Sequence, residues 1–427
     1  MKKIPVVPKE LLVPFVLITF CFALWGFAND ITNPLVKAFG TIFNQGAFVS
    51  SFVQFAFYGG YCFMAIPAAL FIKKYSYKSG ILVGLALYAT GGLLFIPASL
   101  MGLFWPFCAA FFIMTCGLSF LETSANPYIL SMGDEETATQ RLNLAQAFNP
   151  MGTLIGIFVA KDFILAKLNG MSSTERAALP LDEFEAIKMA DLAIVRAPYV
   201  AICIVLVIVF VMILFKKMPQ SETDNHQLNL GDTLKRLFIN IRYREGVLAQ
   251  AFYVGAQITV WTFTIHYGTQ VLMDEGMTES KAATESVSFN FYASCLFLVS
   301  RFICTFLLKY LKPGSLLMYL AIGAVLLVFP VMFAGGRFGL YSLIGISGCM
   351  SLMFPTIYGI ALRGVGDDAK IGAAGLVFAI AGGSILPPVQ GLLVDNWTLN
   401  MSFLMPMVCF MFVALYGYRV HYKYGES

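Results

Sequence analysis

A single carboxylate inside a long apolar stretch is the first residue that needs a chemical explanation. Glu122 ends an uncharged run that begins at Leu103. A charged carboxylate is expensive at the centre of a bilayer, and burial favours the neutral acid. A carboxyl group placed there can take up and release a proton, as a proton-coupled carrier requires. The alternative is a structural side chain that hydrogen-bonds a neighbouring helix.

A second acid, Asp30, lies inside the first apolar stretch. Asn33 follows it by three residues, so both side chains share a helix face. Pro34 comes next and weakens the helix at this point. We therefore expect Asp30 to carry a proton and, with Asn29 and Asn33, to bind substrate. Alternatively, Asp30 caps a break in the helix or lies near the outer membrane surface.

Amide and aromatic side chains recur at helical spacing in three further apolar stretches. A spacing of three or four residues places each pair on one helix face: Gln54 with Tyr58, Gln146 with Asn149, and Gln257 with Trp261. Amides can hydrogen-bond the hydroxyl groups of a sugar, and an aromatic ring can stack on its C–H face. Any one of these residues could instead join two helices. Together with Asn29, Asp30 and Asn33, they predict a sugar site.

Other motifs exclude several kinds of chemistry. The chain has no GxxxxGK[ST] loop for ATP and no HExxH or GxSxG motif for hydrolysis. No two of its nine cysteines have CxxC spacing, which argues against a metal site or a disulfide framework. We expect no enzyme activity, no catalytic residues, no metal and no cofactor. Arg301, inside an apolar stretch, is predicted to form a gate or an ion pair.

Membrane helices must position these residues. Of the 427 residues, 59% are hydrophobic and 12% are charged, whereas soluble proteins have about 25% charged residues. The net charge of +4 indicates no basic surface for nucleic acid. The composition predicts an all-α protein in the lipid bilayer. Windows of about 20 apolar residues predict twelve spans, near residues 11–37, 47–72, 79–100, 103–131, 139–166, 194–215, 246–272, 283–308, 314–334, 338–362, 371–394 and 400–418.

The spans fall into two sets of six. A basic stretch between the sets predicts three parts: an N-terminal half of residues 1–216, a cytoplasmic linker of residues 217–245 and a C-terminal half of residues 246–427. Trp25 and Tyr58 recur as Trp261 and Tyr292 at a nearly constant offset, which indicates two pseudo-symmetric halves. Parallel halves of this kind place a substrate site near the membrane midplane, between them.

The basic residues predict the orientation. Most of the 28 Lys and Arg residues fall in segments on the same side as the N-terminus, and such segments are usually cytoplasmic. We expect a monomeric, multi-pass protein of the bacterial inner membrane with both termini in the cytoplasm.

Several segments of both halves form a recognisable set: Leu24–Asn29, Gln54–Tyr61, Lys73–Ile81, Leu121–Pro127, Arg141–Asn149, Val254–Trp261 and Pro355–Ile357. Together they resemble the L-fucose–proton symporter group of the major facilitator superfamily. The resemblance covers nearly the whole chain. It implies a proton-driven sugar importer that works by alternating access.

The resemblance also implies an essential pair of acids, an aspartate in helix 1 and a glutamate in helix 4. Glu122 matches the glutamate, but the aspartate aligns with Asn33, and the acid occurs instead at Asp30. Either Asp30 takes over the role, or this carboxyl is dispensable for the substrate. The family's tyrosine before the helix-10 proline is replaced by Phe354. Both differences bear on whether the sugar is L-fucose or a related hexose.

The sequence thus predicts import of a monosaccharide together with protons. Two alternatives stay open: a sodium-coupled or uncoupled sugar facilitator of the same fold, and a membrane sugar sensor that does not transport.

Overall fold

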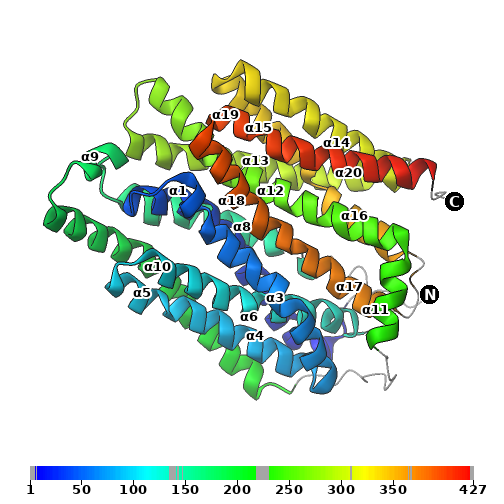
Figure 1. Cartoon of the computed structure of the whole chain (residues 1–427). Helices are drawn as coiled ribbons and strands as arrows, with labels where there is room; N and C mark the ends of the chain where they lie inside the picture. Colours follow the sequence, from blue (N-terminus) through cyan, green and yellow to red (C-terminus); the bar gives the residue numbers. More distant parts are fainter. Residues whose placement is uncertain are drawn as a thin grey trace.

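The chain forms a bundle of long helices that lie side by side in the computed structural model (Figure 1). The described residues are 5, 7–133, 141, 144–146, 148–217, 230–307, 310–363, 365 and 368–423. Helix α1 (Leu12–Ile42) begins, and helix α20 (Leu404–Tyr422) ends, at the same end of the bundle. We call this the terminal end. The short helix α9 (Ser173–Ala177) lies at the opposite end, the α9 end.

The remaining helices are given in chain order. Those before residue 217 are α2 (Ala47–Ser50), α3 (Phe52–Lys74), α4 (Tyr77–Leu93), α5 (Phe95–Met101), α6 (Phe104–Leu130), α8 (Phe148–Val159), η3 (Ala160–Ile164), η4 (Leu165–Lys167) and α10 (Leu181–Phe215). Those after it are α11 (Leu230–Ile239), α12 (Ile241–Asp274), α13 (Glu279–Leu307), α14 (Pro313–Phe329), η5 (Pro330–Ala334), α15 (Gly336–Met350), α16 (Met353–Leu362), α17 (Ala369–Phe378), η7 (Ala379–Ala381), α18 (Gly382–Asn396) and α19 (Leu399–Ser402).

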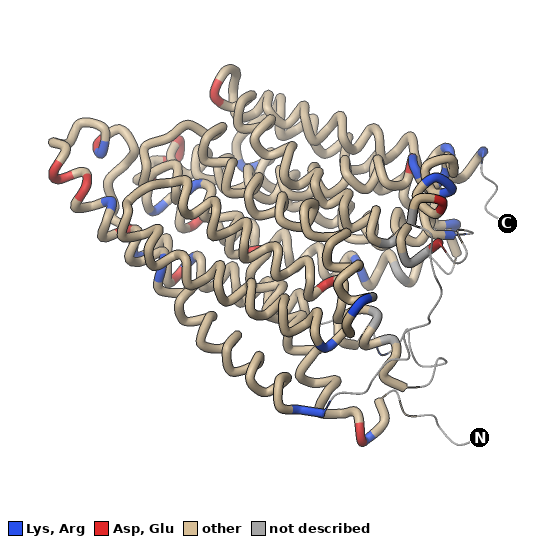
Figure 2. The backbone as a smooth tube through the Cα atoms, turned by 60° about the horizontal axis from the view of Figure 1, so that its bottom comes forward, with Lys and Arg blue, Asp and Glu red and all other residues tan. Residues whose placement is uncertain are grey.

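Eleven helical segments in the described part of the chain are long and apolar enough to cross a membrane. The predicted seventh span, α12, is long enough to cross a membrane, but its composition is less apolar than that of these eleven segments. Its threonines at positions 259, 262, 264 and 269 are buried, because α12 packs on α13, α16, α18 and α20. A helix enclosed by other helices can carry polar side chains that lipid would not accept. Figure 2 shows charged residues mainly at the two ends of the bundle.

Helix α10 begins at Leu181, before the span predicted near residues 194–215. A buried ion pair orders this region: Arg176 Nη2 lies 2.6 Å from Asp191 Oδ2. Asp191 Oδ1 also accepts a 2.8 Å hydrogen bond from the backbone N–H of Asn169. The charged residues here thus fix the chain at the α9 end.

Glycines allow close contact within each half. A Cβ at Gly152 of α8 would overlap the backbone carbonyl of Ala23 in α1. In the second half, a Cβ at Gly382 of α18 would overlap the carbonyl of Ala251 in α12. Small residues let helix backbones approach in this way in membranes. The same device therefore joins the first and fifth spans of one half and the first and fifth spans of the other.

Several helix pairs connect the halves in the described part of the chain. Helix α3 packs on α17 and α18, α8 packs on α13, and α1 packs on α12. Most of the residues predicted to bind substrate lie on α1, α3, α8 and α12. The packing therefore brings these helices to the interface between the halves.

The predicted linker is partly helical. Residues 218–229 lie outside the described residues, and α11 and the start of α12 occupy most of the remainder. Arg236 of α11 binds Asp368 through two hydrogen bonds, of 2.6 and 2.7 Å. The hydrogen bonds from Arg236 lower the pKa of the Asp368 carboxyl. This ion pair attaches α11 to the C-terminal half.

Candidate functional site

Asp30 is a buried acid held by two side chains. Thr153 Oγ1 of α8 donates to Asp30 Oδ2 at 2.8 Å, and Asn33 Nδ2 donates to Asp30 Oδ1 at 3.3 Å. Helix α1 continues through Pro34 to Ile42. Asp30 therefore lies within a continuous helix, and it does not cap a break.

A hydrogen-bond network extends from Asp30 across the interface between the halves. Gln54 Nε2 of α3 donates to Asn33 Oδ1 at 2.8 Å and to Thr262 Oγ1 of α12 at 3.0 Å. Thr262 Oγ1 also lies 3.2 Å from Asn33 Oδ1. Gln54 Oε1 is buried and has no hydrogen-bond partner among the described residues. Because a buried unpaired acceptor is costly, this oxygen is well placed to receive a ligand hydroxyl.

Glu122 is buried on α6, and its carboxylate is poorly satisfied. Glu122 Oε2 has no hydrogen-bond partner in the described part of the chain. Asn126, one turn later on α6, does not bind the carboxylate: its Nδ2 donates to the backbone carbonyl of Glu122 at 3.1 Å. Glu122 interacts electrostatically with Tyr61 of α3 and with Tyr358 of α16. The acid therefore lies within electrostatic range of a tyrosine from each half.

Two tyrosines of α3 interact with the two acids. The rings of Tyr58 and Tyr61 are stacked with centroids 6.3 Å apart. Tyr58 interacts electrostatically with Asp30, and Tyr61 with Glu122. Tyr61 Oη donates to Asn29 Oδ1 at 3.5 Å, a weak contact. This tyrosine pair connects the surroundings of the two carboxyl groups.

The two amides predicted on the fifth span have different contacts. Gln146 is exposed, and its Nε2 donates to Asn126 Oδ1 at 3.0 Å. Asn149 Nδ2 donates to the backbone carbonyl of Phe22 in α1 at 3.3 Å. Asn149 thus joins α8 to α1, which is the structural alternative for such an amide, whereas Gln146 extends the Glu122 side of the site.

The residues predicted in the C-terminal half form an aromatic and cationic group. Trp261 Nε1 donates to Ser347 Oγ at 3.1 Å, and its ring packs edge-on against Phe297 at 5.3 Å. The Arg301 guanidinium lies 4.9 Å from the centre of the Phe297 ring and donates to the carbonyl of Ser351 at 3.3 Å. These contacts hold Arg301 within its own half. Gln257 is half-buried, with no hydrogen-bond partner in the regions that the structure describes.

Three residues of the site escaped the sequence analysis. Thr153 lies four residues after Asn149, and Thr262 directly follows Trp261. Tyr358 lies one turn after Phe354, with which it stacks at 6.3 Å. Tyr358 thus supplies a hydroxyl near Glu122 where Phe354 has none. A search for hydroxyl side chains on the same faces as the amides could have found Thr153, which lies four residues after Asn149.

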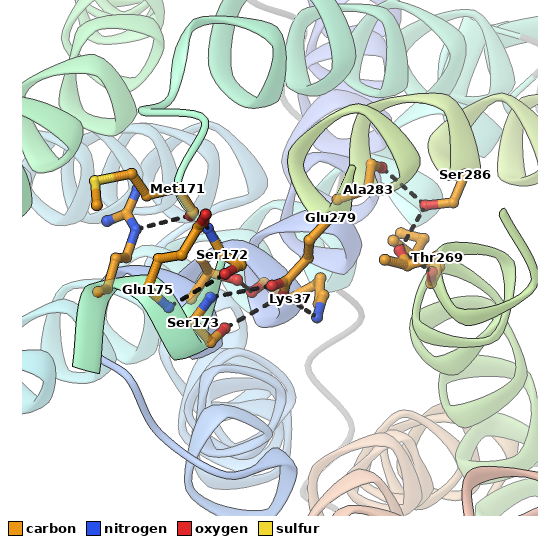
Figure 3. Close-up of polar contacts among 12 residues, drawn as sticks. Lys37, Met171, Ser172, Ser173, Glu175, Thr269, Glu279, Ala283 and Ser286 are labelled. Carbon is orange, nitrogen blue, oxygen red and sulfur yellow. Dashed lines mark hydrogen bonds and ion pairs between the residues drawn. The ribbon is translucent and has the colours of Figure 1, made fainter. Parts of the chain in front are cut away.

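A carboxylate closes the α9 end of the interface. Glu279, the first residue of α13, forms an ion pair with Lys37 of α1, in which Lys37 Nζ lies 3.1 Å from Glu279 Oε1. Its Oε2 accepts from the backbone N–H of Ser173 at 3.0 Å, and its Oε1 accepts from Ser173 Oγ at 3.2 Å. Figure 3 shows these groups converging from three segments. We call Lys37, Ser173 and Glu279 the clasp.

Two further contacts join the halves near the clasp. Asp395 accepts hydrogen bonds of 2.8 Å from the backbone N–H groups of Ala47 and Phe48, at the start of α2. Lys161 Nζ donates to Ser288 Oγ at 2.7 Å. With the clasp, these contacts hold the two halves together at the α9 end.

Removal of the clasp charge is expected to open the α9 end. In Glu279→Gln, the amide cannot form the ion pair with Lys37. Such a pair contributes up to about 1 kcal/mol to the stability of the closed arrangement. The fraction of molecules that are open at this end should therefore rise about fivefold. The measurement is the rate at which a charged, membrane-impermeant maleimide labels a cysteine introduced at Gln257. The exposed Glu183→Gln is the control, and equal rates in both variants would contradict a closing role for Glu279.

Comparisons with known proteins agree with this architecture. The sequence profile of the Major Facilitator Superfamily matches residues 18–381. An L-fucose-proton symporter of Haemophilus influenzae is 49% identical over 426 residues, which cover 97% of this chain and 98% of that protein. An L-fucose-proton symporter of Escherichia coli is 34% identical over 96% of this chain and 93% of its own length.

Another relative and a solved structure extend the match. A glucose/galactose transporter of Brucella abortus is 31% identical, covering 94% of this chain and 92% of its own. The crystal structure of the transporter FucP in its outward conformation has a TM-score of 0.72 and 33% identity, and it covers 96% of this chain and 99% of that one. The matches span nearly all of every chain compared, so the chain belongs to the major facilitator superfamily.

Proposed function

We propose that the chain imports a monosaccharide, L-fucose or a related hexose, together with protons. The observation that carries the proposal is a buried carboxyl, Glu122, whose Oε2 has no hydrogen-bond partner among the described residues and which interacts electrostatically with Tyr358 of the other half. The names of the two L-fucose-proton symporters support this function, since both are similar over nearly the full length. The chain is a transporter and not an enzyme.

The substrate lies, in this proposal, between the halves near the membrane midplane. Its ligands are Asn29, Asp30, Asn33, Gln54, Tyr58, Gln146, Asn149, Gln257 and Trp261. Asn149 contributes through its amide oxygen, because its Nδ2 donates to the backbone carbonyl of Phe22. Gln54 Oε1 is the most favourable acceptor, because it is buried and unpaired among the described residues. Gln257 is half-buried and lies one turn from Trp261, so an amide and an indole can contact the same sugar.

Glu122 and Asp30 carry the protons in the proposed cycle. A buried carboxylate opposes any movement that takes it further from water, because its charge loses solvation. Protonation removes that charge, so the loaded halves can rock past one another. Asp30 differs from Glu122 in accepting two hydrogen bonds, from Thr153 and Asn33. We therefore assign the main coupling role to Glu122 and a combined coupling and binding role to Asp30.

The two moving parts are residues 1–216 and 246–427, connected by 217–245. In the closed α9 end, the Asn33–Gln54–Thr262 network and the clasp hold these parts together. Both have to break when this end opens. Arg301 lies in the C-terminal half, beside Phe297 and Ser351. We propose that it acts there as a gate.

The proposed location is the bacterial inner membrane. The basic residues favour a cytoplasmic terminal end and an external α9 end. We propose that the protein works as a monomer, since each half supplies part of one site.

The test is uptake of labelled sugar into proteoliposomes with an imposed pH gradient. We expect accumulation that an uncoupler abolishes and that is unchanged when sodium is replaced by potassium. Dependence on sodium, or uptake that only equilibrates, would overturn proton coupling. Sugar binding in detergent without any flux would identify a sensor. Competition by L-fucose, glucose, galactose and N-acetylglucosamine then identifies the preferred sugar.

A further inference from the structure

A hollow lies at the α9 end, apart from the network around Asp30. It has a volume of about 470 Å³ and opens between α1, α12 and the segment joining α18 to α19. Its walls include Lys37, His266, Gln270, Asp274 and Trp397. The volume falls in the range of about 300–1,000 Å³ that is usual for small-molecule sites.

The walls carry side chains that suit a neutral, hydroxylated ring. Trp397 is 60% exposed, so much of its indole surface is open to a ligand. Gln270 and Asp274 are exposed and have no hydrogen-bond partner among the residues that the structure describes. An amide both donates and accepts, and a carboxylate accepts. With Lys37 and Asp274 in one hollow, charges of both signs are present, which favours a neutral ligand over an ion.

The hollow leads toward the contacts that close the interface. His266 lies one helical turn beyond Thr262, with its Nδ1 3.4 Å from the Thr262 carbonyl. The Thr262 hydroxyl is part of the network with Asn33 and Gln54. Lys37, on another wall, is held by Glu279 of the clasp. The hollow therefore lies next to both the closed network and the clasp.

We propose that this hollow is an outer binding site for a monosaccharide, occupied while the α9 end is closed. Trp397 stacks on the sugar ring, and Gln270 and Asp274 bind its hydroxyl groups. The proposal rests on the proposed function, since it uses the same class of substrate and an external α9 end. A sugar held here is already at the interface when the clasp and the network open.

The first test compares two tryptophans at the α9 end. Trp397→Ala should raise the KM for external sugar up to about tenfold, because an aromatic contact contributes about 0.5–1.5 kcal/mol. The maximal rate should change less than twofold, and Trp397→Phe should restore most of the affinity. Trp105→Ala is the matched control, since Trp105 is 58% exposed but does not line the hollow.

The second test measures occupancy directly. Met273 lines the hollow and is 43% exposed, so Met273→Cys reports on access without removing a proposed ligand. Sugar should slow the labelling of this cysteine by an impermeant maleimide. In Trp397→Ala, the sugar concentration required to slow the labelling should be about tenfold higher.

Failure of this site can be distinguished from failure of the transport function. A wild-type protein that does not accumulate sugar with a proton gradient overturns the proposed function. If the wild type accumulates sugar but Trp397→Ala behaves like Trp105→Ala, or sugar gives Met273→Cys no protection, the outer site is overturned alone.

Discussion

Replacing Glu122 with glutamine is expected to abolish accumulation of sugar and to preserve exchange. Glutamine keeps the size and polarity of the protonated acid, but it cannot release a proton. The loaded halves can therefore still rock, and sugar on one side can still exchange with labelled sugar on the other. Net movement against a gradient should stop, because the proton no longer contributes to the driving force.

The size of the effect follows from the membrane potential. One charge crossing 100 mV is worth about 2.3 kcal/mol, which supports about a fiftyfold accumulation at equilibrium. In Glu122→Gln, the accumulation ratio should fall to about one. Accumulation is measured in proteoliposomes with a fixed potassium-diffusion potential, and exchange in the same vesicles without one. Glu183→Gln, at an exposed position of α10, is the control. Loss of exchange together with loss of sugar binding would make Glu122 a substrate ligand instead.

Substitution of Gly152 by alanine is expected to destabilise the N-terminal half strongly. A Cβ at this position would overlap the backbone carbonyl of Ala23, and a backbone atom cannot move aside as a side chain can. Helices α1 and α8 would have to separate, which also disturbs the hydrogen bonds from Thr153 to Asp30 and from Asn149 to Phe22. We expect a loss at or above the upper end of the about 1–3 kcal/mol that overpacking usually costs.

The thermal midpoint of the purified protein in detergent measures this loss. Gly359→Ala is the matched control, because Gly359 also lies in a spanning helix but has no atom within 4 Å of an added Cβ. Alanine favours helix over glycine by about 1 kcal/mol, so the control should be neutral or slightly stabilising. Equal midpoints for the two variants would contradict the close contact between α1 and α8.

The fold was largely predictable, because a bilayer imposes a length and an apolar composition on each span. The exception is α12, whose composition is more polar than that of the helices apolar enough to cross a membrane. The twelve-span prediction included α12 as an apolar window of about 20 residues, and its buried threonines reflect enclosure by other helices. Helix α10 is longer than the span predicted near residues 194–215, because its first turns carry charged residues that a search for apolar windows leaves out. One of them, Asp191, pairs with the buried Arg176.

The site was predictable only in part. Residue spacing on one helix identifies shared faces, so Asp30 with Asn33 could be predicted. Contacts between helices depend on packing, which is why the hydroxyls of Thr153 and Thr262 were missed. Asn149 shows the opposite case: its type suits a sugar, yet its amide hydrogen-bonds the backbone of α1. The clasp was not predicted, since Lys37 and Glu279 lie in different halves and no local pattern links them.

Sugar-driven proton movement measures the central claim most directly. Cells or proteoliposomes in a weakly buffered medium are given sugar without any imposed ion gradient, and the external pH is recorded. Wild-type protein should make the medium more alkaline as sugar enters, and Glu122→Gln should not. Sugar entry without alkalinisation in the wild type, or equal alkalinisation by Glu122→Gln, would contradict proton transfer through Glu122.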